Sequence, residues 1–249
     1  MEHHPPSRFQ HAKKWTDYLF EFFMLFLAVF CGFLAEWQLE HTIEHQREKQ
    51  FIESLAEDLK RDTSQVVLYI RFNENILRYC DSLQLYIATT NIFKNSNGFY
   101  DYSKELARYM RYYPTDRTIQ QLKNGGNMRL IRKWNVSNAI TDYDSKTKLL
   151  SETDQQLNEQ IIKYREYLIQ FLDLSAYDSL NRVGSFMDNN VSTHGNPGFI
   201  TNDLKQVKVI YNQAFTLKTF LSTVNKSAEE VNRNAKQLLD LIQREYAMQ

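Results

Sequence analysis

Glycine and proline are scarce in this sequence, with 7 and 4 occurrences in 249 residues. Proteins rich in tight β-turns need both residues, and phosphate-binding loops need glycine where the backbone approaches the ligand. Their scarcity therefore argues against an all-β fold and against a nucleotide-binding loop. Neither residue occurs in residues 33–97, 127–183 or 199–249, and each of these stretches is long enough for an extended helix. We expect an all-α fold.

The sequence also lacks an excess of charge of one sign, since 30 basic residues balance 30 acidic residues. Nucleic-acid-binding domains usually carry a basic excess, so we expect no nucleic-acid partner. Only two cysteines are present, Cys31 and Cys80, and no disulfide framework is expected. No nucleophile elbow and no cofactor motif occur, so the sequence predicts no catalytic residue and no cofactor.

The longest hydrophobic run lies close to the N-terminus and reads FFMLFLAVFCGFLA from Phe22 to Ala35. Trp15 and Trp37 bracket it, as aromatic residues do at the two interfaces of a membrane. The stretch from Trp15 to Trp37 would form roughly 34 Å of helix, which is enough to cross a bilayer. We therefore predict a transmembrane helix over residues 15–37, with the lipid bilayer as a partner.

Two alternatives to a membrane anchor are a buried helix of a soluble protein and a cleaved signal peptide. The second is disfavoured because Phe33 would occupy one of the small positions of a cleavage site. Arg8, Lys13 and Lys14 precede the segment, whereas the basic residues beyond it stand farther away. The positive-inside rule therefore predicts a cytoplasmic N-terminus, location in the inner membrane and a periplasmic C-terminal domain.

Three heptad patterns, in which apolar residues recur at steps of three and four, follow the hydrophobic segment. Such a period, sustained over about five heptads, predicts long helices that pack at a shallow angle. The first pattern comprises Ile52, Leu55, Leu59, Asp62, Val66, Tyr69, Asn73, Ile76, Cys80, Leu83 and Ile87. The second comprises Val136, Ile140, Tyr143, Thr147, Leu150, Asp154, Leu157, Ile161, Tyr164, Leu168 and Phe171. The third comprises Val207, Ile210, Ala214, Leu217, Leu221, Val224, Ala228, Val231, Ala235, Leu238 and Ile242.

Short helices and turns are expected in the connections between these patterns. Thr115 or Asp116 reads as the cap of one short helix, which ends at Asn124-Gly125-Gly126, and residues 94–98 read as a loop. The predicted organisation is a short tail over 1–14, the transmembrane helix over 15–37, a charged helical stalk over 38–50 and a helical bundle domain over 51–249. In that domain we expect an antiparallel bundle of three long helices.

Two segments carry a family resemblance. The hydrophobic segment followed by Glu36-Trp37 and REKQFIESLAEDLKRDT (47–63), together with PTDRTIQQLKNGGNMRLIRKWNVSNAITDYD (114–144), resembles a family of uncharacterised single-pass membrane proteins of Bacteroidota. The matching positions of the second segment are Thr118, Leu122, Gly126, Leu130 and Ile131. The resemblance implies a location in the cell envelope. The family has no assigned activity, so no catalytic residue is carried over.

His41-Thr-Ile-Glu44-His45 matches the H-x-x-E-H pattern of inverzincin metalloproteases. Two histidines four residues apart share a helix face and could bind zinc, with Glu44 as a base. The alternative is a solvated part of the stalk. We favour this alternative, and expect no metal site, because charged residues surround the motif and no third ligand is evident.

Basic residues concentrate between Lys104 and Lys133, where tyrosines interleave with them. Such a segment can bind an anionic partner, or it can pack against acidic helix faces that carry residues such as Asp144 and Asp154. The possible contact surface comprises Arg108, Arg111, Arg117, Arg129, Arg132 and Lys133.

Three functions remain open from the sequence. The first is a non-enzymatic, membrane-anchored interaction or scaffolding module that binds a protein partner or itself, and Ala28 and Gly32 form a small-xxx-small pair that would let two copies approach. The second is a sensor domain that binds a small ligand between its helices and signals through a partner. The third is a metal-dependent hydrolase that uses His41, Glu44 and His45.

Overall fold

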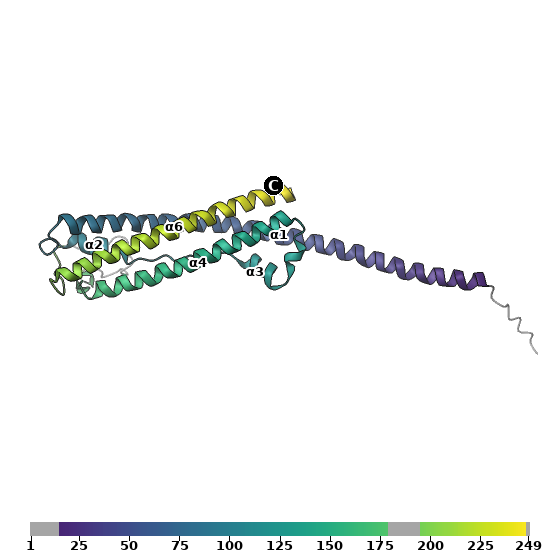
Figure 1. Ribbon diagram of the computed structural model, residues 1–249, viewed down its shortest axis with the longest axis horizontal. Coiled ribbons are helices and arrows are strands. Elements are labelled where there is room, and N and C mark those ends of the chain that lie inside the picture. The colour runs from purple at the N-terminus through teal and green to yellow at the C-terminus, as the bar shows by residue number, and fades with distance from the viewer. Residues whose placement is uncertain (1–14, 179–194, 248–249) are drawn as a thin grey trace, which may run out of the picture. The chain divides into compact units, whose positions relative to one another are not determined.

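The computed structural model describes residues 15–178 and 195–247. Within these ranges the chain is α-helical, and the only β-type pairing is an isolated bridge between Leu172 and Phe199. The expected all-α fold is thus confirmed. The helices are α1 (Trp15–Thr89), α2 (Asn97–Leu106), α3 (Arg117–Asn124), η1 (Asn127–Leu130), α4 (Trp134–Ile169), α5 (Ser175–Asp178) and α6 (Leu204–Tyr246) (Figure 1). The predicted N-terminal tail, with Arg8, Lys13 and Lys14, lies outside the described residues.

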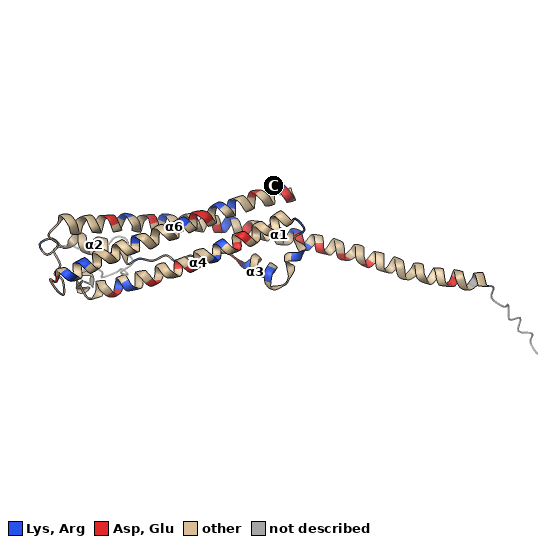
Figure 2. Ribbon diagram, viewed as in Figure 1, with Lys and Arg blue, Asp and Glu red and all other residues tan. Residues whose placement is uncertain are grey.

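The chain divides into two compact units, residues 1–50 and residues 51–249. Helix α1 begins in the first unit and continues without interruption to Thr89. Near its N-terminus, an 18-residue window has a mean hydropathy of 2.2 and contains no buried residue. Figure 2 shows few charged residues along this part of α1. The helix is therefore long and apolar enough to cross a membrane.

The three heptad patterns supply the core of the second unit. Every residue of the second and third patterns is buried, and in the first only Ile87 is partly exposed. Two of the polar residues that occupy heptad positions form hydrogen bonds inside the core. The amide of Asn73 donates to Asn225 at 3.0 Å, and the hydroxyl of Thr147 donates to the carbonyl of Asp144 at 2.9 Å. Buried polar groups are tolerated here because each has a partner.

The relative direction of α1 and α4 differs from the prediction. Tyr143 of α4 bonds to Asp62 of α1, and farther along both helices Tyr69 of α1 bonds to Asp154 of α4. The two helices are therefore parallel, so an antiparallel arrangement of all three long helices is wrong for this pair. The reason is the connection over residues 90–133, which returns along the bundle before α4 begins (Figure 1).

Helix α6 runs in the opposite direction to α1. Asn73 bonds to Asn225, whereas Asp81, farther along α1, pairs with Lys218, which comes earlier in α6. This pair fits the antiparallel arrangement expected between helices joined at one end of a bundle.

Two details of the connections bear on the sequence predictions. Asn97, expected in an exposed loop, is the first residue of α2 and is partly buried. The end of the short helix α3 is as predicted, at Asn124. Gly126 has a φ of 63°, a left-handed conformation that glycine adopts at little cost, and it separates α3 from η1.

Candidate functional site

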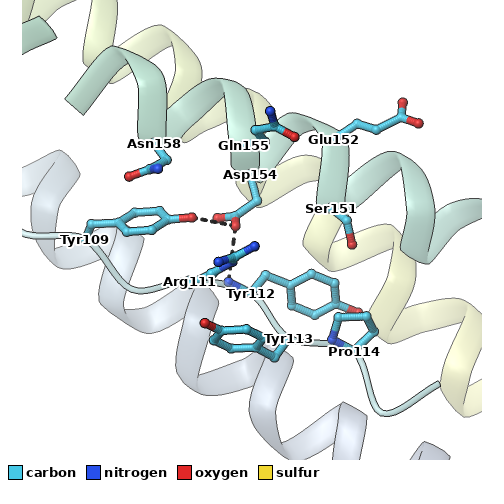
Figure 3. A pocket seen from close by; sticks show the side chains of 10 residues that line it. All are labelled: Tyr109, Arg111, Tyr112, Tyr113, Pro114, Ser151, Glu152, Asp154, Gln155 and Asn158. Atoms are coloured by element: carbon cyan, nitrogen blue, oxygen red, sulfur yellow. Dashed lines mark hydrogen bonds between the residues drawn. The ribbon is translucent and has the colours of Figure 1, made fainter. Parts of the chain in front are cut away.

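Residues 107–116 connect α2 to α3 without helical structure and lie between α1 and α4 (Figure 3). We call them the return segment. Its backbone N–H groups need acceptors, because a buried backbone donor without a partner is costly. Three buried aspartates, Asp58 and Asp62 of α1 and Asp154 of α4, supply acceptors to this segment and to the start of α3.

Asp154 joins three parts of the chain. One carboxylate oxygen accepts from the hydroxyl of Tyr69 at 2.7 Å. The other accepts from the hydroxyl of Tyr109 at 2.7 Å and from the backbone N–H of Tyr112 at 3.3 Å. Asp154 is only 3% exposed, and its three donors are all neutral. Within residues 15–178 and 195–247 it forms no ion pair, so its negative charge has no neighbouring cation bound to it.

Asp62 repeats this arrangement with the two helices exchanged. Its carboxylate accepts from the hydroxyl of Tyr143 in α4 and from the backbone N–H of Thr115, both at 2.6 Å. Each long parallel helix thus contributes one buried carboxylate and one tyrosine donor. A buried carboxylate is stable only where such donors replace the water it has lost.

Asp58 caps α3 from a different helix. It accepts from the backbone N–H of Thr118 at 3.1 Å and from its hydroxyl at 2.5 Å, and Arg117 lies 3.4 Å away. The N–H of Thr118 has no acceptor within α3, since it belongs to the first turn. Asp116 occupies the N-cap position but makes no cap hydrogen bond. Asp116 is thus the N-cap residue, as one of the two predicted alternatives, but the expected side-chain hydrogen bond is absent because a buried carboxylate of α1 already satisfies this donor.

The tyrosines of this site remain protonated over a wide range of pH. Burial raises the pKa of Tyr69, and the charge of Asp154 raises it further. Burial and the hydrogen bond to Asp154 raise the pKa of Tyr109 in the same way. For Tyr112, burial acts first and the charge of Asp62 adds to it. These hydroxyls are therefore donors and not anions.

A pocket of about 550 Å³ opens beside Asp154, between the return segment and α4 (Figure 3). Pockets of this volume are typical of small-molecule sites. The lining residues are Tyr109, Arg111, Tyr112, Tyr113 and Pro114 of the return segment and Ser151, Glu152, Asp154, Gln155 and Asn158 of α4. The polar residues Ser151, Gln155 and Asn158 recur at steps of four and three beside the apolar heptad. That stripe is the sequence signal that could have located the α4 side of the pocket, which our sequence analysis missed.

Three groups of the pocket have bonding capacity left over. The guanidinium of Arg111 is exposed and lies 5.1 Å from the ring centroid of Tyr113. Glu152 is exposed and, among the described residues, has no bonded partner. Tyr112 is only 5% exposed, yet its hydroxyl has no hydrogen-bond partner among them. A buried hydroxyl is usually paired, but this oxygen has almost no accessible surface, so a ligand in the pocket does not reach it.

The residues of the predicted contact surface are distributed over different surroundings. Arg108 is not an exposed charge as expected, because its side chain is only 19% exposed. It pairs with Glu105 at 2.8 Å and lies over the ring of Phe72. Arg111, by contrast, faces the pocket described above.

The remaining four predicted contact residues are all exposed. Arg117 lies beside Asp58 at the start of α3. Arg129 lies in η1, and Arg132 and Lys133 lie between η1 and α4, where Lys133 is 3.5 Å from Glu245. They form a basic group separate in sequence from the pocket.

The alternative interpretation of the basic segment, packing against an acidic helix face, holds at Lys123. Its ammonium lies 2.6 Å from Asp144, which Lys148 also approaches at 2.8 Å. Burial opposes ionisation of Asp144, but the hydrogen bonds from the two lysines outweigh it and lower the pKa. Packing of a basic residue against an acidic side chain does not occur at Asp154, since its hydrogen-bond donors among the described residues include tyrosines and no cation.

The H-x-x-E-H motif lies on α1 within the first unit. The ring of His41 stacks on that of Trp37, with centroids 5.8 Å apart, and Nδ1 of His45 lies 3.6 Å from the carboxylate of Glu48. Among the residues that the structure describes, no three His, Cys, Asp or Glu side chains gather as a metal site would require.

Comparison of the chain with protein-family models, with curated proteins and with solved structures finds no match. The resemblance of residues 47–63 and 114–144 to the Bacteroidota family therefore rests on those sequence motifs alone.

Proposed function

We propose that residues 15–37 anchor this protein in a membrane, and that its helical domain acts by binding and not by catalysis. The main support for a membrane anchor is the apolar surface of α1 near its N-terminus. Large side chains such as Phe22, Leu25 and Phe33 are more than half exposed among the residues that the structure describes. Burial in lipid would remove this surface from water, at a gain of about 25 cal/mol per Å².

The proposed orientation is a cytoplasmic N-terminus with the helical domain in the periplasm, attached to the inner membrane. Labelling of intact cells with a membrane-impermeant thiol reagent tests it. Asn202 is exposed and suits a cysteine probe better than the partly buried Asn97. Asn202→Cys should be labelled in intact cells, whereas labelling only after lysis would reverse the orientation. The unaltered protein is the control, because Cys80 is buried and Cys31 lies in the apolar part of α1.

Action by contact with a protein partner, or with a second copy, is supported by the composition of the second unit. Its long helices devote their heptad positions to packing, while the connection over residues 90–133 carries exposed basic side chains. Crosslinking in membranes, followed by purification, should capture a stable complex. Reversing charge at Arg129 and Arg132 should weaken that complex and leave the fold intact, since exposed charges contribute little to stability.

A second candidate function is a sensor domain that binds a small ligand. The pocket between the return segment and α4 favours it, because it places charged, aromatic and unpaired polar groups around one cavity. Binding of a small molecule to the purified protein tests this candidate separately from anchoring.

A further inference from the structure

We propose that the pocket beside Asp154 binds a small zwitterion with an ammonium group and a carboxylate, such as an amino acid or a short peptide. This inference rests on the second candidate function, ligand binding by the helical domain. It is independent of membrane anchoring.

The α4 side of the pocket suits an ammonium group. Asp154 carries a buried carboxylate whose three hydrogen bonds all come from neutral donors, and Glu152 places a second carboxylate at the exposed rim. A cation in the pocket would compensate this charge, and the attraction beside a carboxylate that is only 3% exposed is stronger than in bulk water. The ring of Tyr109 adds a face that attracts a cation.

The return segment suits a carboxylate. Arg111 offers a planar set of N–H donors, and its guanidinium forms no ion pair within the described residues. A ligand carboxylate would accept two parallel hydrogen bonds from this guanidinium.

Ligands with one kind of charge satisfy only part of this lining. A simple cation leaves Arg111 without an acceptor, and a simple anion is repelled by the charges of Asp154 and Glu152. Gln155 and Asn158 lie on the same wall of the pocket and add amide groups that can bond to the main chain of a peptide.

Calorimetric titration of the full chain in lipid nanodiscs tests the proposal. The probes are the standard L-amino acids and L-alanyl-L-alanine. At least one probe should bind. Whether it is a free amino acid or the dipeptide shows which of these two ligand classes the pocket takes. The amide of the bound probe lacks the negative charge, and its N-acetyl derivative lacks the positive charge. Each derivative should bind roughly tenfold or more weakly than the probe itself, because a charge-assisted hydrogen bond is lost.

Arg111→Gln is the most informative variant. It removes the donors for the ligand carboxylate from an exposed side chain, so the fold should keep its stability while the probe binds roughly tenfold more weakly. Glu152→Gln also alters an exposed side chain and should weaken binding without unfolding. Arg129→Gln is the matched control for Arg111→Gln, because it removes an exposed arginine away from the pocket, and it should leave binding unchanged.

Several results would overturn the proposal. Absence of binding by every probe would do so, as would binding that Arg111→Gln and Glu152→Gln leave unchanged. Equal binding of the amide or N-acetyl derivative would reject a zwitterion. Spermidine and methyl glucoside are further probes, and binding of either without binding of any amino acid or dipeptide would reject the ligand class while ligand binding itself stands.

Discussion

The hydroxyl of Tyr69 donates a 2.7 Å hydrogen bond to the buried carboxylate of Asp154, and so joins α1 to α4 across the core. A second hydrogen bond joins the same two helices, but here the donor, Tyr143, lies in α4 and the acceptor, Asp62, lies in α1. Apolar heptads alone leave the register of two parallel helices weakly specified, because a shift of seven residues again matches apolar positions. We infer that these two tyrosine–aspartate bonds specify the register of α1 and α4.

Replacement of Tyr69 by Phe should destabilise the helical domain. The change removes one donor from a carboxylate that is only 3% exposed, and we expect a loss of about 1–3 kcal/mol in the free energy of unfolding. Urea unfolding of the full chain in detergent, followed by circular dichroism, measures it. Tyr167→Phe, at an exposed position of α4, is the matched control and should have no effect. Equal stability of the two variants would contradict the structural role of Tyr69.

Asp58 should matter more to α3 than Asp116 does. Asp58→Ala removes the acceptor of the Thr118 N–H and hydroxyl, and loss of a helix cap costs about 0.5–2 kcal/mol. Asp116→Ala removes a side chain whose one hydrogen bond among the described residues comes from Gln120, so its effect should be smaller. Hydrogen exchange of the α3 amides compares the two. A larger effect of Asp116→Ala would show that the cap is local after all.

Leu221→Asp should unfold the domain. Leu221 is 1% exposed in the α6 core, and an unpaired buried charge costs several kcal/mol, on the order of the whole stability of a domain. The exposed neighbour Thr219 provides the control, since Thr219→Asp should retain the melting temperature. If both variants melt like the unaltered protein, the third heptad does not face the core.

Alkaline pH should unfold the domain through its tyrosines. Burial raises the pKa of Tyr69, Tyr109, Tyr112 and Tyr143. Their contribution to stability is fully present below the unfolded tyrosine pKa of about 10 and is lost as pH rises above it. Tyrosinate absorbance from these residues should therefore appear together with loss of helical circular dichroism. Their ionisation at unchanged helicity would argue that water reaches the site in the folded protein.

The sequence predicted the helices better than it predicted their arrangement. Heptad spacing located the core residues, because a helix buries positions that recur at a fixed local period. The direction of α4 relative to α1 depends instead on the path of residues 90–133, and no local period encodes that path. The polar interruptions Asp62 and Asp154 were visible in the heptads, but their tyrosine partners lie 81 and 85 residues away in the chain.

The candidate site was predictable only in part. The tyrosines and Arg111 of the return segment stood out as an aromatic and basic segment, whereas the sequence analysis assigned no role to Ser151 and Asn158. They became pocket residues because the return segment lies against α4. Likewise, the cap of α3 comes from Asp58, which is 60 residues from Thr118 in the chain, so a capping pattern among neighbouring residues could not reveal it.

Membrane anchoring by the N-terminal part of α1 is the central claim, and alkaline carbonate extraction of isolated membranes measures it directly. The unaltered chain should remain in the membrane pellet, because an apolar helix of this length is held by the bilayer and not by surface charge. With Leu25→Arg and Val29→Arg together, two charges at the centre of the segment should release the chain into the supernatant. Recovery of the unaltered chain in the supernatant would contradict the claim.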